Sequence, residues 1–170
     1  SEALSKCIRE YTLIVIKSTA PVGTVELVRA ALSPNQKESK DFDIVVNPEF
    51  LREGAGLHDF FYPDRIVMGG RSDRAMTLMR ELYEPIIQGS VPWTDGEPES
   101  DGRSFRSAAP VPVIETDPAT AQMIKYSSNA FLASRISFIN EIAGLCERVG
   151  ADVTEVSKGM GYDHRIGHSY

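Results

Sequence analysis

The stretch from Pro118 to Arg148 constrains the fold of this 170-residue chain most strongly, because no further proline and only Gly144 interrupt it. Asp117 and Pro118 are typical of a helix start, and Gly150 is typical of a helix end. The segment therefore predicts one helix of roughly 30 residues, or about 45 Å, which is long for a globular domain. A short helix over residues 154–160, capped by Asp152, is expected to follow.

Apolar side chains occupy much of the circumference of this predicted helix. One stripe consists of Ile124, Phe131, Phe138, Ile142, Leu145 and Val149, and it is widened by Leu132, Ile136, Ile139, Ala143 and Cys146. A helix with so wide an apolar surface is buried against more than one neighbour. Because a monomer rarely leaves such a strip open, we expect a two-fold homodimer that pairs residues 118–148 of two chains.

Short apolar runs rich in β-branched residues alternate with helical spacing in the remaining sequence. The expected strands are 11–17, 43–46, 65–69 and 111–115. A helix should open at Pro21, with Val25, Leu27, Val28 and Leu32 as its apolar residues. Ser72 should cap another helix, whose apolar face carries Met76, Met79, Leu82 and Tyr83. This alternation predicts an α/β fold with a mostly parallel sheet and right-handed crossovers.

Residues 88–110 break the alternation, because Gly, Pro, Ser and mixed charges are too dense there to bury a core. We predict a flexible insertion at 93–110, with Trp93 as a possible anchor, between an α/β part at 1–92 and a mainly helical part at 111–170.

Composition excludes several functions. The chain is 42% hydrophobic and 25% charged, and its net charge of −6 opposes binding to nucleic acid or anionic membranes. It contains neither an apolar run long enough to span a membrane nor a recognisable signal peptide. Cys7 and Cys146 suggest neither a disulfide framework nor a metal site, and Cys146 fits a small core residue. A cytoplasmic protein without a metal is expected.

Three motifs are the candidates for chemistry: KSTAPVGT at 17–24, NPEFLREG at 47–54 and KYSSNAF at 125–131. The first two follow predicted strands, where α/β sheets bind ligands. Lys125 and Asn129 share one face of the long helix, so Lys125 must either reach water or find a partner. On spacing alone, a solvated lysine and a locally bonded asparagine are the simpler interpretation.

Glu49 and Glu53 fall on one face if Pro48 starts a helical turn. Two close carboxylates would raise one pKa, which suits proton transfer. The alternative is a structural cap, with Asn47 at the N-cap and both glutamates favoured by the helix dipole. The two interpretations are compatible.

In order and wording these motifs resemble the UDP-glucose/GDP-mannose dehydrogenase family, over nearly the whole chain. The resemblance implies a Rossmann-like domain, here its C-terminal part, followed by a central dimerisation helix. It also implies oxidation of the C6 alcohol of a nucleotide sugar to a carboxylate by two NAD+. The combination of NPEFLREG with YPDRIVMG is similar to members that act on UDP-glucose, although GDP-mannose or another nucleotide sugar is an alternative.

The resemblance also implies roles for individual residues. Lys125 and Asn129 would donate to the oxygen at the reacting carbon, and Glu49 would act through water in hydrolysing a thioester. Ser18, Thr19 and Ala20 would contact NAD, with Thr19 also holding water, and Glu53 would approach the cofactor. The substrate contacts implied are Glu49, Phe50, Leu51, Arg52, Glu53, Lys125, Asn129 and Arg165. Arg165, in a D-x-R-I-G pattern, would reach the partner subunit's site, unless it is a plain surface arginine.

Two parts of the family's machinery are absent from the sequence: the Gly-rich dinucleotide loop and the Gly-Gly-x-Cys nucleophile segment. We therefore expect an internal portion of an enzyme that is inactive by itself. The alternative is a non-catalytic binding or dimerisation module derived from such an enzyme. A nucleic-acid-binding role is disfavoured by the charge.

Overall fold

A computed structural model describes residues 2–90 and 110–168 of the chain. The chain forms two compact units, one ending at Lys125 and the other beginning at Tyr126. Within the described residues, no helix combines the length and the apolar character needed to cross a membrane. Trp93 and nearly all of the predicted insertion lie outside the described residues.

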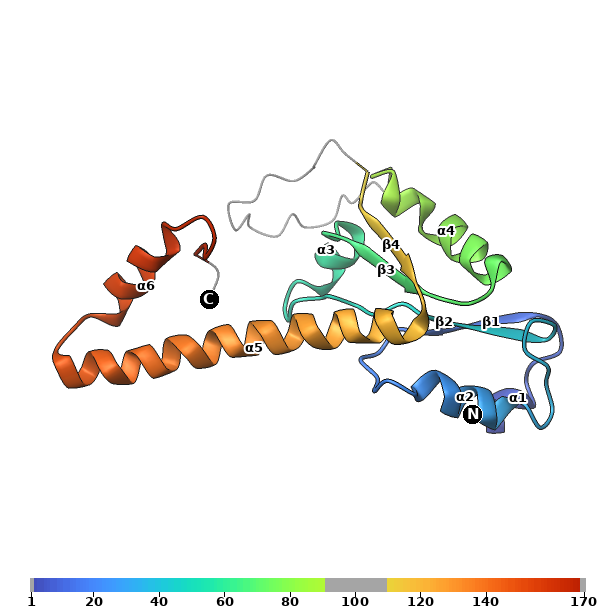
Figure 1. The fold of residues 1–170 in the computed structure, drawn as a ribbon. Helices are drawn as coiled ribbons and strands as arrows, with labels where there is room; N and C mark the ends of the chain where they lie inside the picture. Colours follow the sequence, from blue (N-terminus) through green and yellow to red (C-terminus); the bar gives the residue numbers. More distant parts are fainter. Residues whose placement is uncertain (1, 91–109, 169–170) are drawn as a thin grey trace. The chain divides into compact units, whose positions relative to one another are not determined.

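The first unit is built on a four-stranded sheet (Figure 1). Its strands, in spatial order, are β1 (Thr12–Ile16), β2 (Phe42–Val46), β3 (Ile66–Gly69) and β4 (Val113–Thr116). The pairs β1–β2 and β3–β4 are parallel, as predicted, whereas β2 meets β3 in antiparallel fashion at Val46 and Gly69. The predicted α/β class is therefore confirmed, with one antiparallel junction in the middle of the sheet.

Six helices accompany the strands in the described residues. They are α1 (Glu2–Ser5), α2 (Thr24–Leu32), α3 (Gly56–Phe61), α4 (Asp73–Ile87), α5 (Pro118–Val149) and α6 (Val153–Gly161). The sequence did not predict α1 or α3. It placed the start of α2 at Pro21, but the helix begins at Thr24, after Gly23 adopts a left-handed φ of 99°.

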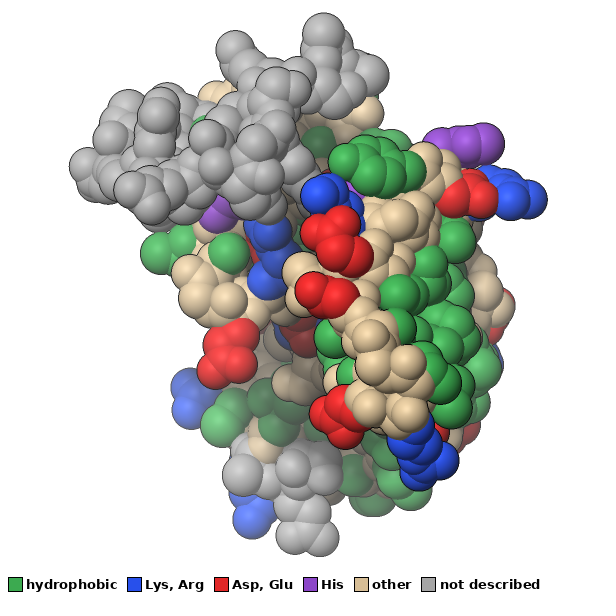
Figure 2. Space-filling model, turned by 90° about the vertical axis from the view of Figure 1, so that its left-hand side faces the viewer, with side chains coloured by type: hydrophobic (Ala, Val, Ile, Leu, Met, Phe, Trp, Pro, Cys, Tyr) green, Lys and Arg blue, Asp and Glu red, His purple; other side chains and the backbone are tan. Residues whose placement is uncertain are grey.

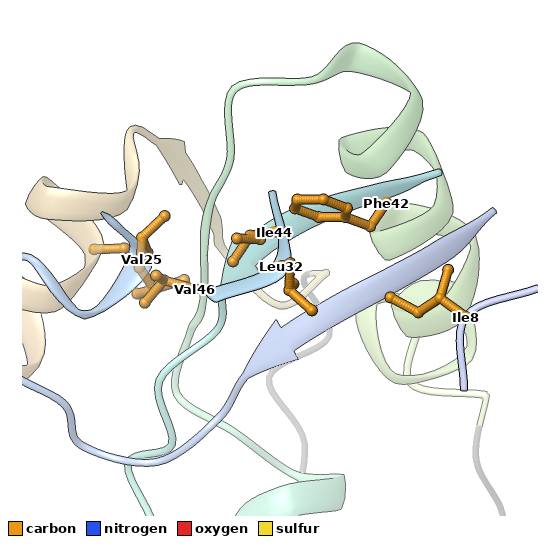
Figure 3. Close-up of a cluster of buried hydrophobic side chains, with 8 residues drawn as sticks. Ile8, Val25, Leu32, Phe42, Ile44 and Val46 are labelled. Carbon is orange, nitrogen blue, oxygen red and sulfur yellow. The ribbon is translucent and has the colours of Figure 1, made fainter. Parts of the chain in front are cut away.

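The core lies on both faces of β2. Phe42, Ile44 and Val46 pack with Val25 and Leu32 of α2 and with Ile8 (Figure 3). Val45, on the opposite face, packs with Met76 and Met79 of α4. Because alternate side chains of a strand point to opposite faces, α2 and α4 cover the two sides of the sheet.

Two side chains predicted to be in the core are exposed instead. Leu27 is 73% exposed and Leu82 is 67% exposed. Leu27 lies about 200° around the helix from Val25, so it faces away from the sheet. Leu82 lies at the edge of the stripe formed by the buried residues of α4.

The start of α5 is fixed against the sheet. The Asp117 carboxylate accepts hydrogen bonds from the backbone N–H of Ala119 (2.9 Å) and Thr120 (3.1 Å), which confirms the predicted cap. Gly69, at the end of β3, lies so close that a Cβ there would be 2.6 Å from Cβ of Ala121 and 2.8 Å from O of Asp117. A side chain at position 69 would therefore displace α5.

Candidate functional site

The centre of the site is an ion pair between Lys125, on α5, and Glu49, just after β2. Nζ of Lys125 lies 3.1 Å from Oε1 of Glu49, and the lysine is only 5% exposed. The sequence left open whether Lys125 reaches water or finds a partner. The structure shows a partner, as the cost of burying an ammonium group requires.

The helical turn at Pro48, on which the pairing of Glu49 with Glu53 depended, does not form. Residues 47–55 form no helix, and α3 begins only at Gly56. Oε2 of Glu49 accepts a hydrogen bond from N–H of Leu51 at 2.8 Å, while Glu53 is exposed. The carboxylate of Glu49 thus turns toward a cation and an amide rather than toward a second carboxylate.

The electrostatics of Glu49 therefore differ from the sequence prediction. Burial alone would raise its pKa, but the hydrogen bond from Leu51 and the ammonium of Lys125, with a further contribution from Lys17, outweigh burial and lower it. The predicted upward shift is wrong because the expected like-charge neighbour is replaced by cations. Glu49 is consequently a carboxylate at neutral pH.

Asn47, which directly follows β2, is hydrogen-bonded to residues of β1, β3 and α4 and to Lys17. It is 2% exposed, its backbone N–H donates to O of Ile16, and its side-chain amide donates to O of Val67 at 2.8 Å. Its Oδ1 accepts from Nζ of Lys17 (3.1 Å) and from the hydroxyl of Tyr83 (2.6 Å). The sequence considered Asn47 as a helix cap, whereas its side chain is used inside the sheet.

The loop after β1 carries the residues that the resemblance assigns to the cofactor. Ser18 and Thr19 are exposed there, at the carboxyl ends of the parallel pair β1–β2. Gln122 of α5 is 3% exposed and donates from Nε2 to O of Ala20 (3.3 Å) and O of Pro21 (2.8 Å). Helix α5 therefore contacts this loop through Gln122 and the loop after β2 through Lys125.

Phe50 and Arg65 complete the surroundings of Lys125. The guanidinium carbon of Arg65 lies 3.9 Å from the ring centre of Phe50, and Nζ of Lys125 lies 5.2 Å from the same centre. Cations are attracted to the face of an aromatic ring, so Phe50 brings together two positive groups that favour an anionic ligand.

Arg52 makes contacts within its own loop. Its Nη2 lies 2.8 Å from Oδ1 of Asp59, and its Nε lies 3.0 Å from Oδ2. Hydrogen bonds from Arg52, opposed by burial, lower the pKa of Asp59 to about 2. The guanidinium thus ties the loop to α3, while Leu51 is exposed beside it.

The two remaining predicted residues belong to the second unit. Asn129 is exposed, one helical turn after Lys125 on α5. Arg165 is exposed and pairs with Asp163, with Nη2 at 2.7 Å from Oδ2. It also borders a hollow of about 350 Å³, which is lined by Phe131, Ser134, Arg135, Phe138, Met160, Arg165 and Ile166.

Sequence reasoning missed Lys17, Tyr83, Gln122 and Arg65 as parts of the site. A signal existed for Lys17, because it is a polar residue that directly follows a predicted apolar strand, like Asn47. Gln122 precedes Lys125 by three positions and so shares its helix face. Tyr83 had no comparable signal, since it was assigned to an apolar helix face.

Comparison with known proteins identifies the family to which the sequence is similar. Residues 1–87 match the NAD binding domain of the UDP-glucose/GDP-mannose dehydrogenase family, and residues 119–170 match the central domain of that family. UDP-glucose 6-dehydrogenase TuaD of Bacillus subtilis is 41% identical over 100% of this chain, which spans 32% of that protein.

Solved structures give the same result. A UDP-glucose dehydrogenase from Pyrobaculum islandicum superposes with a TM-score of 0.77 at 37% identity, covering 98% of this chain and 34% of that one. For a GDP-mannose dehydrogenase from Pseudomonas aeruginosa the TM-score is 0.75 at 27% identity, and the superposition covers 96% of this chain and 34% of that one. The chain thus spans about a third of the length of the relatives it matches. With both of its ends matched and its sheet and long helix reproduced, the chain belongs to the UDP-glucose/GDP-mannose dehydrogenase family.

Proposed function

We propose that the complete protein containing this segment oxidises UDP-glucose to UDP-glucuronate with NAD+. The observation that carries the proposal is the buried contact between Lys125 and Glu49. It joins a cation on α5 to an ionised carboxylate in the loop after β2. The two groups supply what oxidation of an alcohol followed by hydrolysis requires: a stabiliser of developing negative charge and a proton acceptor.

Relatives support UDP-glucose over other nucleotide sugars. The proteins at 41% and 37% identity are named for UDP-glucose, whereas the GDP-mannose dehydrogenase is 27% identical. GDP-mannose or another nucleotide sugar is the alternative substrate, and a competition assay separates them.

The loop after β1 fits NAD. It presents two exposed hydroxyl side chains, Ser18 and Thr19, at the carboxyl ends of parallel strands, where open α/β sheets bind dinucleotides. Ser18, Thr19, Ala20 and Glu53 would hold the cofactor, together with the Gly-rich loop that this chain does not contain. NAD+ supplies the hydride acceptor for each of the two oxidation steps.

Lys125 is placed to stabilise charge at the reacting carbon. An ammonium group has three N–H donors, and one of them points to Glu49, so the others are available for a substrate oxygen. Because Lys125 is almost fully buried, its charge is screened less than it would be in water. Asn129, one turn later, would add an amide donor to the same oxygen.

Glu49 is suited to the hydrolytic step. A cysteine from outside this chain would capture the aldehyde, and the second oxidation would leave a thioester. The ionised Glu49 carboxylate would then accept a proton from water as that water attacks the thioester carbonyl. The carbon–sulfur bond would break, which releases the cysteine thiol and a glucuronate. Thr19 would hold the same water from the opposite loop.

The second unit supports a dimer. In the part of α5 that belongs to the second unit, six apolar side chains have half or more of their surface exposed: Phe131, Leu132, Ile136, Phe138, Leu145 and Val149. Figure 2 shows hydrophobic side chains gathered along one side of the face it presents. Pairing α5 with its copy in a second chain would cover them, and it would bring Arg165 toward the partner subunit's site. We place this dimerising part at 111–170 and the cofactor part at 1–92, and we expect a cytoplasmic protein.

The test uses the complete protein. Purified protein with UDP-glucose and NAD+ should give two NADH per glucuronate, and GDP-mannose should give a much lower kcat/KM. Glu49→Gln should stall after both oxidations, because an amide cannot accept the proton from water, so intact-protein mass spectrometry should detect a covalent adduct. If the complete wild-type protein forms no NADH but self-associates, the segment belongs to a non-catalytic dimerisation module.

A further inference from the structure

Lys17 directly follows β1, and its side chain reaches Asn47, just after β2, and Tyr83 of α4. Its Nζ donates to Oδ1 of Asn47 and to the hydroxyl of Tyr83, both at 3.1 Å. The hydroxyl of Tyr83 in turn donates to Oδ1 of Asn47 at 2.6 Å. These three side chains form a closed triangle of hydrogen bonds between the ends of β1 and β2 and helix α4.

The charge of Lys17 is not neutralised where it sits. Among residues 2–90 and 110–168, no carboxylate lies within ion-pair distance of its Nζ, which is instead 5.7 Å from the ring centres of Phe60 and Tyr83. Aromatic faces and neutral oxygens stabilise an ammonium group without cancelling its field. That field therefore extends to the neighbouring loops.

The triangle connects the two loops that carry the predicted chemistry. Lys17 directly precedes Ser18 and Thr19, and Asn47 lies two residues before Glu49. A displacement of either partner would be transmitted to the loop next to it, because Asn47 is fully buried and its side-chain oxygen and amide are both hydrogen-bonded.

We propose that Lys17 is a positioning residue that holds the loops at 17–20 and 47–50 in one arrangement and maintains a positive field beside Glu49. This inference rests on the function proposed above. Lys17 need not touch the reacting atoms, since it acts through Asn47, Tyr83 and the backbone of the two loops.

The groups around Glu49 make the effect of this field predictable. Burial raises the pKa of Glu49, and Leu51, Lys125 and finally Lys17 lower it. Lys125 faces Glu49 from α5, Lys17 from the end of β1, and Arg65 stacks on the adjacent Phe50 from the start of β3. Removing Lys17 takes away one of the positive charges that lower the pKa of Glu49. Burial then has a larger share, so the pKa of Glu49 should rise.

The experiment compares Lys17→Met, Lys17→Arg and Tyr83→Phe in the complete protein, with Lys40→Met as the control at an exposed lysine. Hydrogen exchange read by mass spectrometry reports on the backbone amides of residues 18–20, 47 and 49–51 without any need for activity. The kcat of UDP-glucose oxidation as a function of pH reports on Glu49.

Lys17→Met should lower kcat between about 10-fold and 100-fold, as expected for misplaced reacting groups. It should also speed exchange in both loops and move the acid limb of the pH profile to higher pH. Lys17→Arg should keep the acid limb near its wild-type position, because it keeps the charge. Tyr83→Phe should speed exchange in the same loops with the charge intact.

The proposal is overturned if Lys17→Met leaves exchange and the acid limb unchanged and only lowers the melting temperature. If Lys17→Met does not fold, unchanged exchange and kcat in Tyr83→Phe overturn it instead. A wild-type protein that makes no NADH contradicts the proposed function, whereas the exchange result in the two loops still decides whether Lys17 positions them.

Discussion

Replacing Gly69 by alanine tests whether the close approach of β3 and α5 positions the site. The added Cβ would lie 2.6 Å from Cβ of Ala121, 2.8 Å from O of Asp117 and 2.9 Å from Cα of Pro118. Two of these three atoms belong to the backbone, so no side-chain rotation relieves the overlap. The first turn of α5 must move away from the sheet.

The cost follows from overpacking. Forcing one methyl group into a closely packed contact typically destabilises a protein by about 1–3 kcal/mol. The movement also carries Lys125, which lies on the next turns of the same helix, away from Glu49. Because a misplacement of about 1 Å can reduce the rate on the order of 10²-fold, kcat should fall more than stability alone explains.

The assay measures the free energy of unfolding and kcat of the complete protein. Gly144→Ala is the matched control, because the Cβ added at this helical glycine meets no atom within 4 Å apart from its own helix backbone and its chain neighbours. Its expected effect is a stabilisation of about 0.5–1 kcal/mol with unchanged kcat. A Gly69→Ala protein with wild-type stability and kcat would refute the claim that this contact sets the position of Lys125.

Three further predictions concern charge and assembly. Lys125→Met keeps the apolar stem and removes the ammonium, so kcat should fall on the order of 10²-fold or more, and a fall in thermal stability alone would make Lys125 structural. The pKa of Asp59 is lowered from 3.8 to about 2, so its pairing with Arg52 stabilises the fold above pH 3.8 and this gain disappears as the pH falls through about 2. Thermal melts should therefore show Asp59→Asn less stable than wild type at neutral pH and equal to it near pH 2, and a constant difference would contradict the assignment. Phe138→Asp with Ile142→Asp should convert a dimer to a monomer in sedimentation equilibrium, and a wild-type protein that is already monomeric would exclude pairing through α5.

The elements that sequence predicted correctly depend on residues within one helical turn or one strand. Asp117 caps α5 and Asp152 caps α6 because each carboxylate bonds to a backbone amide two or three residues away. The apolar run ending at Ile16 had to be a strand covered on both faces, and this too is a local property.

The parts that sequence could not predict depend on contacts between distant segments. The antiparallel junction of β2 and β3 is a matter of pairing, and the composition of neither strand specifies it. Similarly, the expected pairing of Glu49 with Glu53 does not form, because the real neighbour of Glu49, Lys125, becomes adjacent only after the sheet and α5 have packed, and it lowers the pKa of Glu49. The adjacent Glu53 was visible in the sequence but points elsewhere.

The hydrogen bonds of Asn47 restrict which amino acids can occupy position 47. Its amide must donate to Val67, and its oxygen must accept from Lys17 and Tyr83 at once. Aspartate lacks the donor, leucine lacks both functions, and glutamine is one methylene too long for a site with 2% exposure. A residue that need not touch a ligand thus accepts almost no replacement, and mutational tolerance at position 47 would resemble that of a catalytic residue.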